Sequence, residues 1–545
     1  MSYRSWLSNY FLSRDRGWIL SLLAAVCVVY LPFLGNPLFF DDVPFFYGNV
    51  AAQYAHSWFQ FDLRWFPYAT LGWTEWLFSN VVTHFFHLGN LLLHAANVML
   101  LFYLLRLLVG SAVPDNQNPG VVVWGAWFGA LIFALHPVAG YAVGYVVQRS
   151  ILMATFFALL MQLAYVRGLL TGQARWLVLA AAAYFMAVFS KEHSVMLLAV
   201  LAVETITLRS RIRASTLSLW LAWAVFFAIG LLIMLRAKGV FGTPYEAMAA
   251  DLFKQDGIVA STPVLHLLSA MTQAGLFFKY LLLWILPNPA WMAIDMRETF
   301  VASWLSWRGL LGAAGFLAYG ALGMWLLLRP RWIGLAGLAL LYPWLQFVLE
   351  FSSIRVQEPF VLYRSYLWMP GLMLLIPLLL NKWPGRKTFL ALGLSVLLLL
   401  PLALNRQWVF ADNYRLWNDA ALLLPNDKVS GADRILFNRA QAEEGRNRLD
   451  DAIVDFERVI AISPQYAPVR FELGWAYLKA RRYQEAMVQF DAAIMLDPSF
   501  SNAYYGKAMI LKMQHENGQA AELMAKSCEL KNAMACLIVK GRMGP

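Results

Sequence analysis

The chain has 545 residues, of which 60% are hydrophobic and 14% are charged, whereas a typical soluble protein has about 25% charged residues. This composition excludes an ordinary soluble enzyme and indicates an integral membrane protein. The formal charge of +11 lies almost entirely in residues 1–404, since residues 405–545 carry 18 basic and 17 acidic side chains. Basic residues beside apolar runs are what the positive-inside rule produces, so we expect no nucleic-acid partner.

The N-terminus resembles a secretory signal, because arginines precede the apolar run 17–34. The run is too long for a signal and lacks a small-residue cleavage site, so we expect an uncleaved anchor. Cys27 lies within it and is interpreted as inert packing. Cys528 and Cys536 lie in the polar tail and could pair if that tail faces an oxidising compartment.

Eleven apolar runs, the N-terminal one included, approach the twenty residues that a spanning helix needs. The predicted spans are 17–36, 85–109, 121–142, 150–168, 175–190, 193–208, 217–236, 309–328, 333–350, 367–381 and 388–404. One more run, 264–287, is ambiguous. All clusters of Arg and Lys between spans fall on the inner side only if this run does not cross, and instead lies at the outer surface or re-enters.

This orientation predicts an all-α polytopic bundle of about 11 crossings in residues 1–404, with the N-terminus inside. An odd number of crossings places Asp41-Asp42, the loop 351–366 and the C-terminal domain on the outer side together.

Residues 405–545 repeat with a period of 34, the period of tetratricopeptide repeats. Three alanines, two phenylalanines and two prolines recur at this spacing: Ala452, Ala486 and Ala520, Phe456 and Phe490, and Pro464 and Pro498. With a degenerate unit near 413–425, we expect about three repeats that form an α-solenoid. Stacked helix pairs leave a concave groove for a peptide or a partner; the alternative is a structural cap.

The acidic pair Asp41-Asp42 follows the first apolar run directly. Adjacent carboxylates at a membrane surface are costly to desolvate, and their repulsion raises one pKa, which can leave a base poised to accept a proton. The alternative is a helix-capping Asp with a solvated neighbour.

Four further regions that we expect on the outer side carry unusual polar residues. His136 precedes Pro137, and Arg149 begins the next span, where it either snorkels or holds a lipid phosphate. His136 could equally be a hydrogen-bonding residue at a helix end. Lys191, Glu192 and His193 lie between two spans, as an ordinary hairpin or as part of an anionic-substrate site.

The other two regions lie closer to the C-terminal end of the predicted bundle. Gln273, Lys279 and Tyr280 lie on the ambiguous run, and Glu358, Tyr363, Arg364 and Tyr366 lie at the mouth of the span 367–381. A carboxylate pair with several cations suits transfer of a group from an anionic lipid donor, because the acid deprotonates a hydroxyl while the cations hold the departing phosphate. No phosphate loop, serine-hydrolase elbow or zinc spacing occurs. Asp41-Asp42 could hold a divalent cation, but a donor phosphate held by Arg and Lys does not need one, so we expect no metal or other cofactor.

In this order the motifs resemble the GT-C glycosyltransferases, most closely the transmembrane and tetratricopeptide-repeat (TMTC) O-mannosyltransferases and their bacterial relatives. The matching pieces are Phe40-Asp41-Asp42, Leu135-His136-Pro137 with Gln148-Arg149, Ser190-Lys191-Glu192, Gln273 with Tyr280-Leu281 and Leu286-Pro287, Glu358 with Tyr363-Arg364-Ser365-Tyr366, and Asn405-Arg406 with Leu416-Trp417. Tyr363 departs from the family, which usually has a His before this Arg.

The resemblance implies an inverting transfer in which Asp41, favoured over Asp42, is the base. It implies a polyprenyl-phosphate-linked sugar as donor and a Ser or Thr hydroxyl of an exported protein, such as a pilin, as acceptor. The chain would lie in a bacterial inner membrane, with the active site and the repeats in the periplasm. The alternatives are a polymerase or ligase of lipid-linked surface polysaccharide and a membrane-anchored scaffold without catalysis.

Overall fold

The computed structural model describes residues 15–78, 83–113, 119–237, 243, 261–356 and 358–540. All regular elements among these residues are helices. The described residues form two compact units. The first unit ends at Asp412, and the second comprises the rest of the chain together with the short segment Asp295–Thr299.

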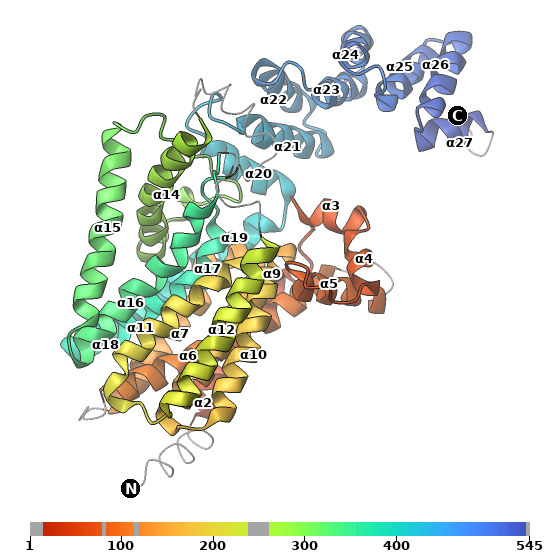
Figure 1. Cartoon of the computed structure of the whole chain (residues 1–545). Coiled ribbons are helices and arrows are strands. Elements are labelled where there is room, and N and C mark those ends of the chain that lie inside the picture. Colours follow the sequence, from red (N-terminus) through yellow and green to blue (C-terminus); the bar gives the residue numbers. More distant parts are fainter. Residues whose placement is uncertain are drawn as a thin grey trace. The chain divides into compact units, whose positions relative to one another are not determined.

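The first unit is a bundle of apolar helices, several of which lie side by side in Figure 1. Its longer helices are α2 (Arg16–Tyr30), α6 (Thr83–Ala112), α7 (Pro119–Leu135), α9 (Arg149–Thr171), α10 (Ala174–Ser190), α11 (Leu197–Thr207), α12 (Thr216–Arg236), α14 (Thr262–Ile285), α15 (Trp307–Leu327), α16 (Arg331–Phe347), α18 (Leu375–Lys382) and α19 (Arg386–Phe410). The predicted helical bundle is confirmed.

Nine helical segments of the described ranges are long and apolar enough to cross a membrane. They are Arg16–Phe33, Thr83–Ala112, Val146–Thr171, Thr216–Arg236, Thr262–Ile285, Trp307–Leu327, Arg331–Ser352, Leu362–Lys382 and Arg386–Phe410. A tenth is the bent pair Gly120–Leu135 and Pro137–Val143, which turns by 52°. Pro137 lacks an N–H and cannot continue the hydrogen-bond ladder of α7, so the break falls at His136.

Two of the eleven predicted spans contain helices shorter than the roughly twenty residues that a spanning helix needs. The predicted span 175–190 is a helix of 17 residues, α10, and the predicted span 193–208 contains a helix of 11 residues, α11. At 1.5 Å per residue, α11 rises about 16 Å, so it reaches bilayer thickness only together with the tight turns of Glu192–Met196 that precede it.

Helices α14 and α15 are consecutive, yet they run in the same direction. Met271 lies against Gly309 near the start of both, and Phe278 lies against Gly315 one to two turns later. Parallel neighbours require the connection between them to return to the end at which α14 began. This geometry is the one expected if the run 264–287 re-enters, although α14 is also long and apolar enough to cross; its path through a membrane stays a prediction.

Short helices follow α2, namely α3 (Asp42–Tyr47), α4 (Val50–His56) and α5 (Trp65–Phe78). Four non-glycine residues of this region have positive φ angles: Phe40, Asn49, Phe61 and Arg64. Bulky residues rarely adopt this conformation, and such strain gathers at functional sites.

The second unit consists of helix pairs that follow one another along the chain (Figure 1). The pairs are α21 (Ala432–Gly445) with α22 (Leu449–Ile462), α23 (Ala467–Lys479) with α24 (Tyr483–Leu496), and α25 (Ser501–Met513) with α26 (Asn517–Glu529); α20 (Asn413–Leu422) precedes them and α27 (Ala533–Val539) follows. The alanines and phenylalanines of the 34-residue period are buried. A Cβ on Gly474 or Gly506 would lie 2.6 Å from the Phe490 ring, so both positions need the smallest residue. The described part of the second unit thus contains three helix pairs, and the predicted helical repeat domain is confirmed.

The boundary between the units falls after Asp412, eight residues beyond the predicted start at 405, because α19 continues to Phe410. The segment Asp295–Thr299 belongs to the second unit through Asp295, whose carboxylate accepts hydrogen bonds from Arg297 at 2.8 Å and from Arg434 at 2.7 Å.

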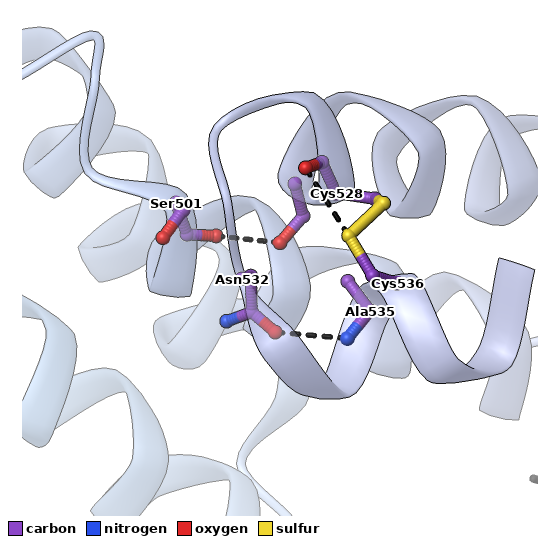
Figure 2. Close-up of a disulfide and its surroundings, with 6 residues drawn as sticks. Ser501, Cys528, Asn532, Ala535 and Cys536 are labelled. Atoms are coloured by element: carbon purple, nitrogen blue, oxygen red, sulfur yellow. Dashed lines mark hydrogen bonds between the residues drawn. A yellow bond between two sulfur atoms is a disulfide. The ribbon is translucent and has the colours of Figure 1, made fainter.

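Cys528 and Cys536 form a disulfide between α26 and α27 (Figure 2). The same end of the unit is held by two hydrogen bonds, from the Ala535 N–H to the Asn532 side chain and from the Ser527 hydroxyl to the Ser501 carbonyl. The pairing that the sequence left open is therefore present.

Candidate functional site

The two carboxylates of the acidic pair have different environments. Asp42 is fully buried and accepts backbone N–H groups of Val146 at 3.3 Å and of Val147 at 2.7 Å. Burial raises the pKa of Asp42 to about 8, against the opposing effect of these N–H groups. Asp41 is exposed. Asp42 therefore fixes the corner of the chain, and Asp41 is the carboxylate that a substrate can reach.

Tyr145 holds Asp41 in place. Its phenol oxygen accepts the backbone N–H of Asp41 at 3.0 Å and is also hydrogen-bonded to the Asp41 side chain. Burial and the two neighbouring aspartates raise the pKa of Tyr145 well above its ordinary value, so the phenol keeps its proton and can donate it to a carboxylate. The ring stacks on Phe39 at 5.3 Å.

The strained residue Arg64 reaches a second part of the site. Its Nε donates to Oε2 of Glu192 at 3.0 Å, and a second nitrogen binds the other carboxylate oxygen. Such bidentate pairs are among the strongest polar contacts. Burial acts to raise the pKa of Glu192, but Arg64, His193 and Lys191 together hold it well below its usual range.

Glu350 is the centre of a buried ion cluster. Its Oε2 binds Nε of Arg355 at 3.0 Å and a guanidinium nitrogen of Arg364 at 3.1 Å, and its Oε1 lies 3.0 Å from Nε2 of His193. Glu350 is fully buried, and its three partners are each 4% exposed. A buried carboxylate requires this degree of compensation.

Lys191 completes the cluster. It is 4% exposed, and its Nζ lies 5.9 Å from the Tyr363 ring centre. No hydrogen bond or ion pair joins this Nζ to the described part of the chain. Burial, with smaller contributions from Arg64, Arg364 and Arg355, lowers the pKa of Lys191 to about 7 against the opposing effect of Glu192. Four cationic side chains thus face two carboxylates, and the excess positive charge suits an anionic ligand.

Tyr363 joins the two halves of the site. The Tyr363 ring lies 5.9 Å from the Tyr145 ring, edge to face. The Lys191 Nζ lies over the same Tyr363 ring, 5.9 Å from its centre. Through Tyr145 and Tyr363, Asp41 is two side-chain contacts away from Lys191. The structure therefore brings together the acidic pair, the 191–193 segment and the loop that carries Tyr363 and Arg364.

Helix α14 supports the late loop. The Tyr280 hydroxyl accepts the N–H of Val361 at 2.8 Å and donates to its carbonyl at 3.0 Å. Gln273 donates to the Pro359 carbonyl at 2.8 Å, and Lys279 lies 4.9 Å from the Phe360 ring. Gln273, Tyr280 and Lys279 thus position the loop that carries Glu358 and Arg364. Glu358 itself is half-buried.

Three predicted donor-binding residues have hydrogen-bond partners within the fold. Arg149 is buried and donates to Asn90 at 2.9 Å and to the Phe86 carbonyl at 2.9 Å, which ties α9 to α6. His136 accepts the Val138 N–H and stacks on Trp284 at 4.1 Å.

Tyr366 contacts His94 at 2.7 Å and Asn97 at 3.2 Å inside the bundle. The polar atoms of Arg149, His136 and Tyr366 thus bind groups of the fold, and the assignment of these residues to donor binding stays a prediction.

Sequence reasoning did not assign Arg64, Tyr145, Glu350 and Arg355 to the site. Glu350 was detectable in principle, because a carboxylate at the end of an apolar run needs a buried cation. Arg64 carried no signal, since an Arg in an outer loop is usually solvated. Within the described ranges, no three or more His, Cys, Asp or Glu side chains are grouped to hold a metal ion; the expectation of a reaction without metal stays a prediction.

Comparison with known proteins identifies one segment of the second unit. The tetratricopeptide repeat family model matches residues 444–510, from the end of α21 into α25. No curated protein matches the chain. The crystal structure of MamA is similar at 19% identity and a TM-score of 0.20, over 29% of this chain and 85% of that chain.

The crystal structure of the APC/C hetero-tetramer Cut9-Hcn1 is similar at 14% identity and a TM-score of 0.22, over 87% of this chain and 92% of that chain. At these TM-scores neither likeness carries an argument. Residues 444–510 are a tetratricopeptide repeat segment.

Proposed function

We propose that the protein is a membrane glycosyltransferase of GT-C type that moves a sugar from a polyprenyl-phosphate-linked donor to a Ser or Thr hydroxyl of an exported protein. The observation that carries this proposal is the exposed carboxylate of Asp41, two side-chain contacts away from a buried cation cluster whose Lys191 Nζ has no hydrogen bond or ion pair within the described ranges. A base and a group of cations in one region are the minimum that this reaction needs.

In the proposed step, Asp41 accepts the proton of the acceptor hydroxyl as the hydroxyl oxygen attacks the anomeric carbon of the donor sugar. The bond between that carbon and the phosphate oxygen breaks, and its electron pair leaves with the polyprenyl phosphate. Lys191, Arg364 and Arg64 stabilise the charge that develops on the phosphate. Attack opposite the leaving group inverts the anomeric configuration. The step is complete without a metal ion or nucleotide.

A cavity in the first unit offers space for the isoprenoid chain. It has a volume of about 600 Å³ and its lining is mostly apolar. His136 and Trp284 form part of its wall, and the Trp284 N–H donates to the Ser365 hydroxyl at 2.9 Å, directly beside Arg364 in sequence. This contact supports a donor that lies with its phosphate at the cluster and its chain in the cavity.

The second unit supports the choice of a protein acceptor. Phe437, Phe471 and Tyr505 occupy equivalent positions on α21, α23 and α25, and all three are half-buried. Equivalent positions 34 residues apart line the same face of stacked repeats, as in solenoids that bind extended peptides. The disulfide between Cys528 and Cys536 supports an oxidising compartment for this unit, which in a bacterium is the periplasm.

The test is intact-mass spectrometry of exported proteins from cells that carry the wild-type chain or Asp41→Asn. We expect one exported protein to lose a sugar-sized mass in the variant. Asp62→Asn is the matched control, because Asp62 is an exposed aspartate of the same outer segment, and it should leave the mass unchanged.

Two outcomes would contradict the proposal. If no protein changes mass but surface polysaccharide shortens, the chain is a polymerase or ligase of lipid-linked glycans. If neither changes, the chain acts as a scaffold, the role that the repeat segment would also allow. A truncation after Asp412 separates the units: we expect loss of acceptor modification with continued hydrolysis of the donor.

A further inference from the structure

A second polar cluster lies inside the helices of the first unit and takes no part in the proposed transfer. Glu204 on α11 is fully buried, and neither of its carboxylate oxygens has a hydrogen-bond partner among the described residues. Gln162 on α9 is also fully buried, and its Oε1 is unpaired within the same ranges. Ionisable residues inside apolar bundles are rare and usually mark a site.

The hydrogen bonds of the neighbours orient these oxygens. Gln162 Nε2 donates to the Ala158 carbonyl at 3.0 Å and to the Tyr342 hydroxyl at 3.0 Å, so both amide hydrogens are used and Oε1 is left over. Glu204 lies within electrostatic range of Tyr342 and of Tyr165. Helix α11 packs against both α9 and α16, which carry these partners.

On the other side, the Tyr165 hydroxyl contacts Thr205 at 2.7 Å, and Thr205 itself donates to the Leu201 carbonyl at 2.7 Å. These hydroxyls are therefore already bonded to one another and to the backbone. In this group the carboxylate of Glu204 and Oε1 of Gln162 are left without a hydrogen bond to the described residues. The Tyr342 oxygen can accept once more.

We propose that Glu204, Gln162 and Tyr342 form a binding site for a monovalent alkali cation such as Na⁺. The ligands are all hard oxygen atoms, which such cations prefer over nitrogen or sulfur. The charge count selects a monovalent ion, because one carboxylate neutralises one positive charge. A divalent ion would leave an uncompensated charge in an apolar interior, which is strongly unfavourable.

The competing account is that Glu204 is permanently protonated, so that no ion is needed. A neutral carboxylic acid would donate one hydrogen bond and would show no dependence on alkali cations. The two accounts differ in a measurement that does not involve sugar transfer, so failure of this proposal leaves the proposed function untouched, and the reverse also holds.

The experiment measures binding of ²²Na⁺ to the purified full-length chain in detergent, with choline as the replacing cation. We expect saturable binding that unlabelled Na⁺ displaces, and its loss in Glu204→Gln. Gln162→Leu should weaken binding at least tenfold, which tests the site even if Glu204→Gln fails to fold. Glu472→Gln is the matched control, because Glu472 is a half-buried glutamate of the second unit.

A second measurement compares thermal unfolding in NaCl and in choline chloride at equal ionic strength. Stabilisation grows with ligand concentration when the ion binds only the folded state, so the wild-type midpoint should rise with NaCl and that of Glu204→Gln should not. Absence of saturable ²²Na⁺ binding in a folded wild-type chain, or equal binding in wild type and folded Glu204→Gln, would overturn the proposal and identify Glu204 as a neutral buried acid.

Discussion

The phenol oxygen of Tyr145 accepts the backbone N–H of Asp41 at 3.0 Å, 104 residues apart in the chain. Directly after this tyrosine, the N–H groups of Val146 and Val147 bind Asp42. One corner of the chain thus anchors both aspartates, but it buries only Asp42. The structure thereby separates two adjacent carboxylates that the sequence treats alike.

The first prediction concerns this separation. Asp41→Asn should abolish sugar transfer and leave the thermal midpoint unchanged, because Asp41 is exposed. Asp42→Asn should lower the free energy of unfolding by about 1–3 kcal/mol, since an amide replaces an acceptor that satisfies two backbone N–H groups. Transfer assays and thermal melts on both variants check this. A large destabilisation by Asp41→Asn would reverse the assignment.

The second prediction concerns pH and Asp42. Its pKa is raised from 3.8 to about 8 in the folded chain, so the folded state binds more protons than the unfolded state between these values. The contribution of Asp42 to stability is then fully present below about pH 4 and is lost as pH rises through about 8. As pH rises across this window, the unfolding midpoint of Asp42→Asn should fall less steeply than that of the wild type. Identical slopes would contradict the expectation.

The third prediction concerns Tyr145. Tyr145→Phe keeps the ring that stacks on Phe39 but removes the hydroxyl that binds Asp41. We expect kcat to fall by about 10- to 100-fold, in line with about 1.5–3 kcal/mol for a hydrogen bond to a charged group. KM for the donor should stay within about twofold, because the phosphate cluster is intact. Phe39→Leu is the control for loss of ring packing alone, and an equal loss of kcat there would mean that the hydroxyl is not needed.

The fourth prediction concerns Lys191 and the donor. Because the pKa of Lys191 is lowered to about 7, the side chain is charged below this pH and neutral above it. Binding of a polyprenyl phosphate should therefore weaken as pH rises through about 7, and Lys191→Met should bind weakly at every pH. Titration of a short-chain prenyl phosphate by fluorescence checks this. Lys191→Arg, which stays charged, should lose the pH dependence but keep the affinity.

The fifth prediction concerns the disulfide of Figure 2. Its removal in Cys528→Ser with Cys536→Ser should destabilise the last repeat by about 2–3 kcal/mol, because the closed loop is short and the chain-entropy gain grows with loop length. Hydrogen exchange should rise in α26 and α27 and remain unchanged in α21. In cells, both thiols should resist alkylation until a reductant is added, whereas free thiols at these positions would place the tail in a reducing compartment.

Regular features of the fold were predictable because their signals are local. The 34-residue period predicts the helix pairs, since Ala452, Ala486 and Phe490 occupy inward positions that depend only on nearby chain. Apolar runs predict long helices for the same reason. The run 264–287 is the exception: its own composition does not decide its path, and only its parallel packing on α15 indicates one.

The sequence by itself thus determined the bundle, the repeat segment and most of the polar positions that converge on one site, Asp41, Lys191 and Arg364 among them. Only the tertiary structure decided which polar atoms are already occupied. Arg149 and Tyr366 bind helices of the fold, whereas the Lys191 Nζ has no such bond to the residues that the structure describes. The physical reason is that a polar side chain already bonded to the fold has less capacity left to bind a ligand than one without such a bond. Those groups come from segments far apart in sequence, which no local pattern can pair.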